Sequence, residues 1–191
     1  EHLPFCADIR RSASGASTAV SGCASLCAFA HYRLGMTPED LVEMEAIKRL
    51  KYRYVRLLDL KEFDELETLF LEDATASYSD GRYTFTDRAG IIGFLRKALG
   101  PLTMITSHKV HQPEIELTGT DTATGVWGLE DVVIISDAGI TIRGAAFYAD
   151  EYAKVDGAWR IRHTGYRRVF EEMGPRPADL KLTANHWGDT A

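Results

Sequence analysis

The sequence predicts an α+β domain in which three helices pack on a strongly curved antiparallel sheet. Two patterns along the chain predict it. Between about residues 37 and 100, apolar residues recur with the spacing of amphipathic helices. From about residue 109 to residue 170 the period changes to two, and turn sequences separate the segments. Helices that precede hairpin-connected strands indicate this layered architecture.

The first helix is expected to begin at Pro38. Thr37 has the properties of an N-cap, proline suits the first helical position, and acidic residues follow in the first turn. Its basic residues lie mostly off the apolar stripe, so a solvated face is expected for Lys48, Arg49, Lys51, Arg53 and Arg56. The stripe itself consists of Leu41, Met44, Ile47, Leu50, Tyr54, Leu57 and Leu58.

Two shorter helices are expected before the long strands. The segment DLKEFDELETLF, residues 59–70, predicts the second helix. The third has Asp87 as its cap and Gly100-Pro101 as its stop. Between them, residues 73–86 have β character that an Asp-Gly turn interrupts.

Four long strands follow, and their connections GTD, SDAG and VDGA have hairpin character. A sheet that curves over helices can enclose an apolar cavity, which is a common place for a small-molecule site. The strands are expected at residues 109–119, 122–136, 139–155 and 158–170.

The length of 191 residues favours one domain with tails. We place the domain at residues 36–172 and a tail, either loose or an arm onto a partner subunit, at 173–191. Residues 1–35 are rich in Ser, Ala and Gly. Arg10-Arg11 and the VSGC segment resemble parts of an export signal. Serines and glycines, however, interrupt the hydrophobic stretch that such a signal requires. We favour a disordered or non-native extension before Met36, and a cytoplasmic protein.

Composition and missing motifs exclude several classes of function. The formal charge of −6 argues against binding to nucleic acid or to an anionic membrane. No apolar run is long enough for a transmembrane helix. All three cysteines precede Met36, so no disulfide framework or zinc site is expected after it. A Gly-rich phosphate loop and a GxSxG elbow are missing, so we expect no cofactor and no metal.

Tyr54, Asp59 and His108 are the candidate acid–base groups on apolar elements. Tyr54 and Asp59 are five positions apart, which separates them by about 140° around a helix. They converge only if the helix ends near Leu58 and Asp59 turns inward, or if a cavity wraps the helix end. Each also has a structural interpretation: a core aromatic for Tyr54, a cap of the second helix for Asp59, and a backbone-bonded strand residue for His108.

Several longer motifs resemble the SnoaL-like branch of the nuclear-transport-factor-2-like superfamily. They are IKRLKYRYVRLLDLKEFDELETLFLEDAT, IIGFLRKAL, TSHKVHQPEIELTGTDTATGVWGLED and YADEYAKVDGAWRIRHTGYRR. The likeness covers roughly residues 38–170. It implies a cone of strongly bent sheet closed by three helices, with a pocket inside, in a homodimer or homotrimer. Members that are enzymes include dehydratases, polyketide cyclases and ketosteroid isomerases.

The resemblance to the dehydratases implies a site of Tyr54, Asp59 and His108. In the predicted mechanism, His108 is oriented by Asp59 and moves a proton, while Tyr54 donates to the developing oxyanion. Burial in an apolar pocket is expected to raise the pKa of the Asp59 carboxyl.

Further residues are predicted to bind the substrate. Regular strands would place Trp127 and Tyr148 as aromatic walls, and the alternative role of each is core packing. Arg168 resembles a late-strand arginine of some family dehydratases, with Arg167 as an equal geometric rival. His111 is expected on the outer or subunit-contact face. His163 has no assigned role and, in a regular strand, lies on the same side as Trp159 and Ile161.

The predicted function is that of a cofactor-independent dehydratase, isomerase or cyclase. Its substrate is expected to be a small hydrophobic hydroxy- or keto-compound, polycyclic ones included. The alternative is a non-catalytic binding or assembly module, in which Asp59 caps the second helix and contributes about 0.5–2 kcal/mol of stability.

Overall fold

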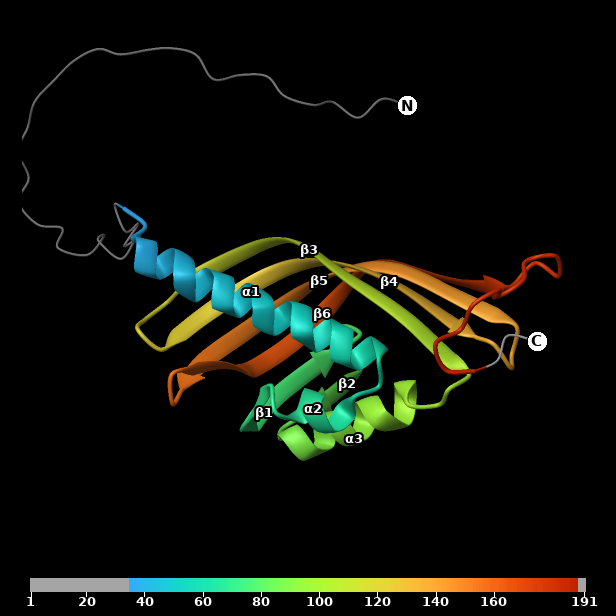
Figure 1. Ribbon diagram of the computed structural model, residues 1–191, viewed down its shortest axis with the longest axis horizontal. Coiled ribbons are helices and arrows are strands. Elements are labelled where there is room, and N and C mark those ends of the chain that lie inside the picture. The colour runs from blue at the N-terminus through green and yellow to red at the C-terminus, as the bar shows by residue number, and fades with distance from the viewer. Residues whose placement is uncertain (1–34, 189–191) are drawn as a thin grey trace, which may run out of the picture. The chain divides into compact units, whose positions relative to one another are not determined.

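The computed structural model describes residues 35–188, so both interpretations of the N-terminal extension lie outside the described residues. Figure 1 shows the elements in chain order, and the predicted α+β class is confirmed. They are α1 (Pro38–Asp59), α2 (Phe63–Glu67), β1 (Phe70–Tyr78), β2 (Tyr83–Phe85), α3 (Arg88–Leu99), β3 (Met104–Leu117), β4 (Thr122–Ile135), β5 (Ile140–Val155) and β6 (Ala158–Pro175).

The six strands form one sheet in the order β2-β1-β6-β5-β4-β3. Strands β3 to β6 are an antiparallel meander, as predicted. The expectation of an entirely antiparallel sheet is wrong at one place, because β1 runs parallel to β6. The β1–β2 hairpin precedes α3 in the chain and joins the sheet beside its last long strand. Helix α1 lies across one face of the curved sheet, and α2 and α3 lie near the C-terminal end of α1 (Figure 1).

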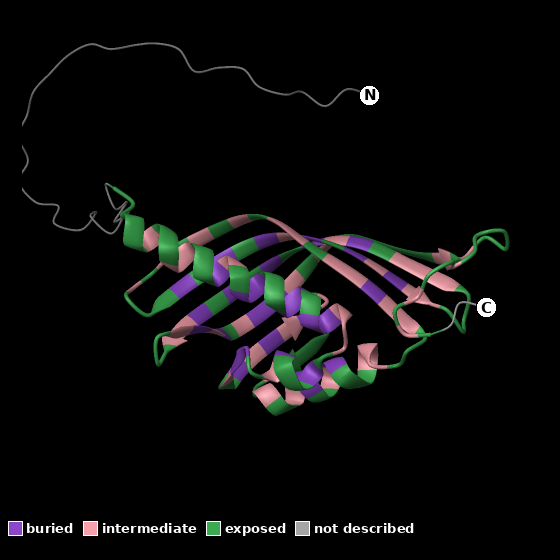
Figure 2. Ribbon diagram, in the orientation of Figure 1, coloured by how far each residue is buried: buried purple, intermediate pink, exposed green. Residues whose placement is uncertain are grey.

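Helix α1 begins as its sequence predicts. The Thr37 hydroxyl accepts a hydrogen bond from the Asp40 amide at 3.1 Å, and the Asp40 carboxylate accepts one from the Thr37 amide at 3.0 Å. This reciprocal capping box satisfies two amides that the helix itself leaves unpaired. The buried residues of α1 lie in its C-terminal part, from Ile47 to Leu58, where Figure 2 shows them between exposed ones. Leu41, which was predicted in the apolar stripe, is exposed. None of the helices in residues 35–188 is long and apolar enough to span a bilayer.

The solvated basic face predicted for α1 is wrong at one residue. The side chain of Lys51 is completely buried, whereas Arg49, Arg53 and Arg56 are exposed. Lys51 follows the buried Leu50 and lies one turn before Tyr54, on the side of the helix that faces the sheet.

Several element boundaries differ from the prediction. Helix α2 ends at Glu67, so Phe70 opens β1 instead of closing a helix. Strand β3 already begins at Met104. Strand β6 continues to Pro175, where Met173 pairs with Ile142 of β5, so three residues expected in the tail belong to the sheet.

Strand β6 contains a β-bulge that changes which residues face the helices. Tyr152 of β5 pairs with Ile161 and its neighbour Glu151 pairs with His163, so Arg162 is the extra residue. The regular alternation that would keep His163 beside Ile161 is therefore broken. Beyond the bulge, Thr164 is fully buried, while the ring of His163 contacts the Thr75 hydroxyl of β1 at 2.6 Å.

Candidate active site

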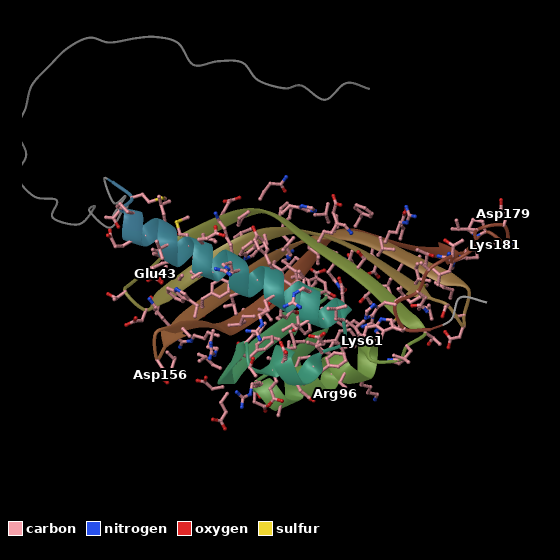
Figure 3. All side chains as sticks on the ribbon, in the orientation of Figure 1. Glu43, Lys61, Arg96, Asp156, Asp179 and Lys181 are labelled. Atoms are coloured by element: carbon pink, nitrogen blue, oxygen red, sulfur yellow. The ribbon has the colours of Figure 1, made fainter. Side chains whose placement is uncertain are left out.

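The C-terminal end of α1 is fixed against the start of β3. Asp59 is the last residue of the helix, and Lys61 follows with a left-handed φ of 58°. The Lys61 ammonium donates to the Leu99 carbonyl at the end of α3 and to the Met104 carbonyl of β3, the latter at 2.7 Å. Figure 3 labels Lys61 at this junction. Three elements that are distant in sequence therefore meet beside Asp59.

Asp59 accepts three hydrogen bonds from β3. The donors are the Thr106 hydroxyl at 2.8 Å, the His108 backbone amide at 2.8 Å and the His108 ring Nδ1 at 2.6 Å. The N-cap of α2 is Glu62, and no side chain caps that helix. Asp59 therefore binds His108 and does not cap α2, which was the alternative role that the sequence analysis considered.

These contacts decide the charge of Asp59 and the tautomer of His108. Burial alone would raise the pKa of the Asp59 carboxyl, but the hydrogen bonds from His108 and Thr106 outweigh burial, so this pKa is lowered. The predicted direction was wrong. An ionised carboxylate only accepts, so Nδ1 of His108 carries the hydrogen, and in the neutral form of the ring Nε2 has a free lone pair.

A cavity of about 140 Å³ adjoins this pair; we call it the His108 cavity. Four of the six predicted site residues line it. Asp59 is not in the lining, but it contacts the lining residue His108. Tyr54 therefore shares the cavity with His108 of β3, which Asp59 holds, and Tyr54 and Asp59 do not share a helix face. The lining consists of Tyr54, His108, Tyr148 and Arg168, with Asp131, Leu58, Tyr78, Phe94, Leu95, Ala98, Leu99, Val133 and Tyr166.

Tyrosine rings form much of the cavity wall. The rings of Tyr54 and Tyr148 meet edge to face, with centroids 6.3 Å apart, and Tyr148 meets Tyr166 in the same way at 5.7 Å. Burial raises the pKa of the phenols of Tyr54, Tyr78 and Tyr148. These groups are therefore neutral at physiological pH and can donate hydrogen bonds to a ligand.

Arg168, and not Arg167, faces the cavity, because the bulge at Arg162 shifts the alternation of β6. Its Nη2 lies 3.0 Å from Oδ2 of the buried Asp131, and Nη1 contacts Oδ1 of the same carboxylate. Burial opposes the charge of Arg168, but the hydrogen bonds with Asp131 raise the pKa of its guanidinium. Arg167 has an 89% exposed side chain and pairs with Asp80 at the surface.

Asp131 was not among the predicted site residues. It lies on β4 opposite Gly144 of β5. A Cβ at Gly144 would lie 2.5 Å from the Arg168 guanidinium, so this glycine makes room for the ion pair. The period of two places Asp131 on the same face of β4 as Trp127 and Leu129, whereas its neighbour Glu130 is exposed. This alternation was a signal for an inward Asp131 that the sequence analysis did not use.

Removing the Arg168 side chain is expected to destabilise the protein more than removing its neighbour. Arg168→Ala leaves Asp131 buried without its partner, which costs about 1–3 kcal/mol of unfolding free energy. Arg167→Ala is the matched control and should change it by no more than about 0.5 kcal/mol. Urea denaturation measures both. Equal losses would contradict this orientation of β6.

The remaining predicted residues lie away from the cavity lining. Trp127 is fully buried, and its indole donates to the Tyr152 hydroxyl at 3.0 Å. His111 lies 3.8 Å from the exposed Glu130. A larger open groove of about 830 Å³ runs along α1 beside Arg49 and Arg160, and it contains none of the six predicted residues.

The lowered pKa of Asp59 predicts a contribution to acid stability. A carboxyl whose pKa falls on folding stabilises the protein above its unfolded pKa of about 4. This contribution disappears as the pH falls through the folded-state value. Asp59→Asn should therefore flatten the loss of unfolding free energy on acidification, as measured by denaturation at several pH values. Asp64→Asn, at an exposed aspartate, is the control, and identical slopes for wild type and Asp59→Asn would contradict the prediction.

Within residues 35–188, no group of three or more His, Cys, Asp or Glu side chains is arranged to hold a metal ion. The polar side chains at the His108 cavity supply acid–base and hydrogen-bonding groups. They comprise one histidine held by a carboxylate, several neutral phenols and one paired arginine.

A family comparison identifies the domain that contains this site. The model of the SnoaL-like domain matches residues 39–165. The chain belongs to the SnoaL-like family. The resemblance to the SnoaL-like branch of the nuclear-transport-factor-2-like superfamily is thereby confirmed, while the closed cone and the dimer or trimer that it implies stay predictions.

Solved structures of the same fold include proteins named for elimination reactions. A proposed scytalone dehydratase from Novosphingobium aromaticivorans is 26% identical, with a TM-score of 0.67, over 76% of this SnoaL-like chain and 99% of the other. The hexachlorocyclohexane dehydrochlorinase LinA-type3 from Novosphingobium barchaimii is 20% identical, with a TM-score of 0.63, over 73% of this chain and 93% of the other. The second likeness shows the fold alone.

Proposed function

We propose that this SnoaL-like protein is a cofactor-independent acid–base enzyme, a dehydratase or isomerase, that acts on a small cyclic hydroxy- or keto-compound in the His108 cavity. The observation that carries the proposal is the hydrogen bond of 2.6 Å from His108 Nδ1 to Asp59, made in the wall of a tyrosine-lined cavity. A histidine held in this way has one nitrogen free to exchange a proton with a ligand.

The proposed reaction begins with proton transfer from carbon. Nε2 of His108 takes the proton from the carbon next to a carbonyl group, and the electron pair of that C–H bond forms an enolate. Tyr54 donates to the enolate oxygen, and Tyr148 is placed in the same wall. Asp59 stabilises the imidazolium that forms.

Two outcomes follow from such an enolate. In a dehydration, the electron pair returns to form a carbon–carbon double bond, and a β-hydroxyl group leaves as water with the proton from His108. In an isomerisation, the substrate has a β,γ double bond in place of the hydroxyl group, the enolate is conjugated with it, and His108 returns the proton to the γ-carbon. Both outcomes are balanced without an oxidant or a reductant.

The cavity volume favours the smaller substrates in the predicted range. An apolar cavity of about 150 Å³ holds one benzene ring, and the His108 cavity has about 140 Å³. One ring with its polar substituents fills this space, so a polycyclic compound would have to extend outside it. Its apolar lining of Leu58, Phe94 and Leu95 suits a hydrocarbon ring.

Deuterium exchange tests the proposal without knowledge of the natural leaving group. A cyclic β-hydroxyketone such as 3-hydroxycyclohexanone is incubated with the protein in D₂O. We expect deuterium to enter next to the carbonyl, as observed by NMR, and the conjugated enone to appear by its ultraviolet absorbance, both faster than in buffer. A panel of such ketones that binds without exchange or elimination would contradict the enzyme and favour the binding module.

A further inference from the structure

Lys51 and Asp150 form an ion pair in the interior. The Lys51 ammonium lies 2.7 Å from Oδ2 of Asp150, and neither side chain has any exposed surface. Among the lysines of residues 35–188, Lys51 is the one that is buried. It comes from α1 and Asp150 from β5, so the pair joins the helix to the sheet.

The hydrogen bonds of Asp150 are made by its neighbours on the sheet. The Tyr152 hydroxyl donates to Oδ2 at 2.7 Å, and the Thr164 hydroxyl donates to Oδ1 at 2.7 Å. Asp150 is thus held in a fixed orientation, with its charge directed toward Lys51.

Stability alone does not account for this pair. Two charges that leave water lose their hydration, and their attraction in the interior often does no more than offset that loss. Replacing a buried ion pair by apolar residues of similar size often leaves a protein equally stable. Burial lowers the pKa of the Lys51 ammonium, while the charge of Asp150 acts in the opposite direction.

The Lys51 ammonium also contacts two rings of the His108 cavity. It lies 3.4 Å from the ring centroid of Tyr148 and 4.8 Å from that of Tyr54. Both tyrosines line the cavity, whereas Lys51 does not reach its surface. A cation over a ring face is attracted to the π electrons. The negative charge of Asp150 acts against an anion here, since it raises the pKa of both phenols, but the ammonium is the charge in direct contact with the rings.

We propose that Lys51 is a positioning residue of the His108 cavity. It holds the rings of Tyr54 and Tyr148 in place and supplies a positive charge that favours an anionic ligand oxygen bound against their hydroxyls. The inference rests on the proposed function, because an enolate is such an oxygen anion. It adds a preference for oxyanions that the cavity lining alone would not predict.

Binding of two phenols of similar size tests this role without the natural substrate. At one mildly alkaline pH, para-nitrophenol is an anion and para-cresol is neutral, and calorimetry measures the affinity for each. The variant Lys51→Met/Asp150→Asn removes both charges together, so no unpaired charge is left in the interior. Thr164→Val removes one hydrogen bond to Asp150, keeps both charges and serves as the matched control.

Wild type and Thr164→Val are expected to prefer the anion, and the double variant to lose about tenfold or more of that preference. A purely structural role would weaken both phenols equally, and that result overturns the inference. So does a wild type that binds neither phenol. In that case the exchange reaction and the His108 variants still decide the proposed function independently.

A measurement on the wild type does not depend on the folding of any variant. In protein labelled with ¹⁵N-lysine, the buried ammonium of Lys51 is shielded from solvent and should give a slowly exchanging NMR signal. We expect this signal to move when para-nitrophenolate binds and to stay in place with para-cresol. An equal response to both compounds, or no response, overturns the inference.

Discussion

Replacing His108 by alanine is expected to lower kcat/KM by roughly 10²–10⁴-fold, the usual contribution of one positioned acid–base group. The imidazole lies in the cavity lining, is oriented by a carboxylate and has a second ring nitrogen that can accept a proton from a ligand. Asp59→Asn should have a loss of similar size, because an amide cannot hold the same tautomer and cannot stabilise the imidazolium. Turnover of the cyclic hydroxyketone found active in the exchange experiment measures both effects.

His111→Ala is the matched control for this prediction. His111 lies on the same strand three residues further on, beside Glu130 and outside the cavity lining, so its removal should leave kcat/KM within a few-fold of the wild type. The melting temperatures of all three variants are measured in parallel, so that a loss of folding is not mistaken for a loss of catalysis. Normal turnover by His108→Ala would reject the proposed mechanism.

Replacing Lys51 alone by methionine is expected to have the largest effect on stability, a loss of about 3–5 kcal/mol. Methionine fills a similar volume but leaves the carboxylate of Asp150 in the interior without its positive partner. Since a domain is typically stable by about 5–15 kcal/mol, this loss is a large fraction of the total. Chemical denaturation measures the change.

Lys48→Met is the matched control on the same helix. Lys48 lies 3.6 Å from Glu45 at the surface, and such a pair contributes no more than about 0.5 kcal/mol. The double variant Lys51→Met/Asp150→Asn should regain much of the stability that Lys51→Met loses. A Lys51→Met protein as stable as Lys48→Met would mean that water or another group compensates Asp150.

Local patterns were sufficient for most of the secondary structure. The capping box at Thr37 and the Asp87 cap, which accepts from the Gly90 amide at 2.7 Å, lie where the sequence predicted them. Caps and hydrophobic periods depend on residues within a few positions of each other, so one sequence contains them fully. Element ends that depend on strand pairing, such as the extension of β6 to Pro175, were not predicted.

The site required contacts between distant segments. Asp59 and His108 are 49 residues apart and meet because Lys61 ties the end of α1 to the start of β3. The helical spacing of Tyr54 and Asp59 predicted that they lie on different faces of α1, and they do. They belong to one site because Asp59 holds His108 of β3, which lines the same cavity as Tyr54. Residue spacing within one helix cannot show such an arrangement.

The choice between Arg167 and Arg168 depended on a single extra residue. A regular β6 would have placed Arg167 on the side of Trp159 and Ile161, and the bulge at Arg162 reverses this alternation. Bulges arise from the pairing of two strands, and the sequence of β6 alone does not reveal one. The same shift moved His163 away from the inner face.

By itself, the sequence determined the order of the helices and strands, the α+β class and the family, and it singled out Tyr54, Asp59 and His108 as candidates, because periodicity, caps and motifs are local properties. Only the tertiary structure decided that Asp59 holds His108, that Arg168 pairs with Asp131 and that Lys51 is buried against Asp150. Each of these is a pairing of charged or polar groups from elements far apart in the chain. Such pairs depend on how the elements pack and on where burial removes water, and residue spacing along the chain predicts neither.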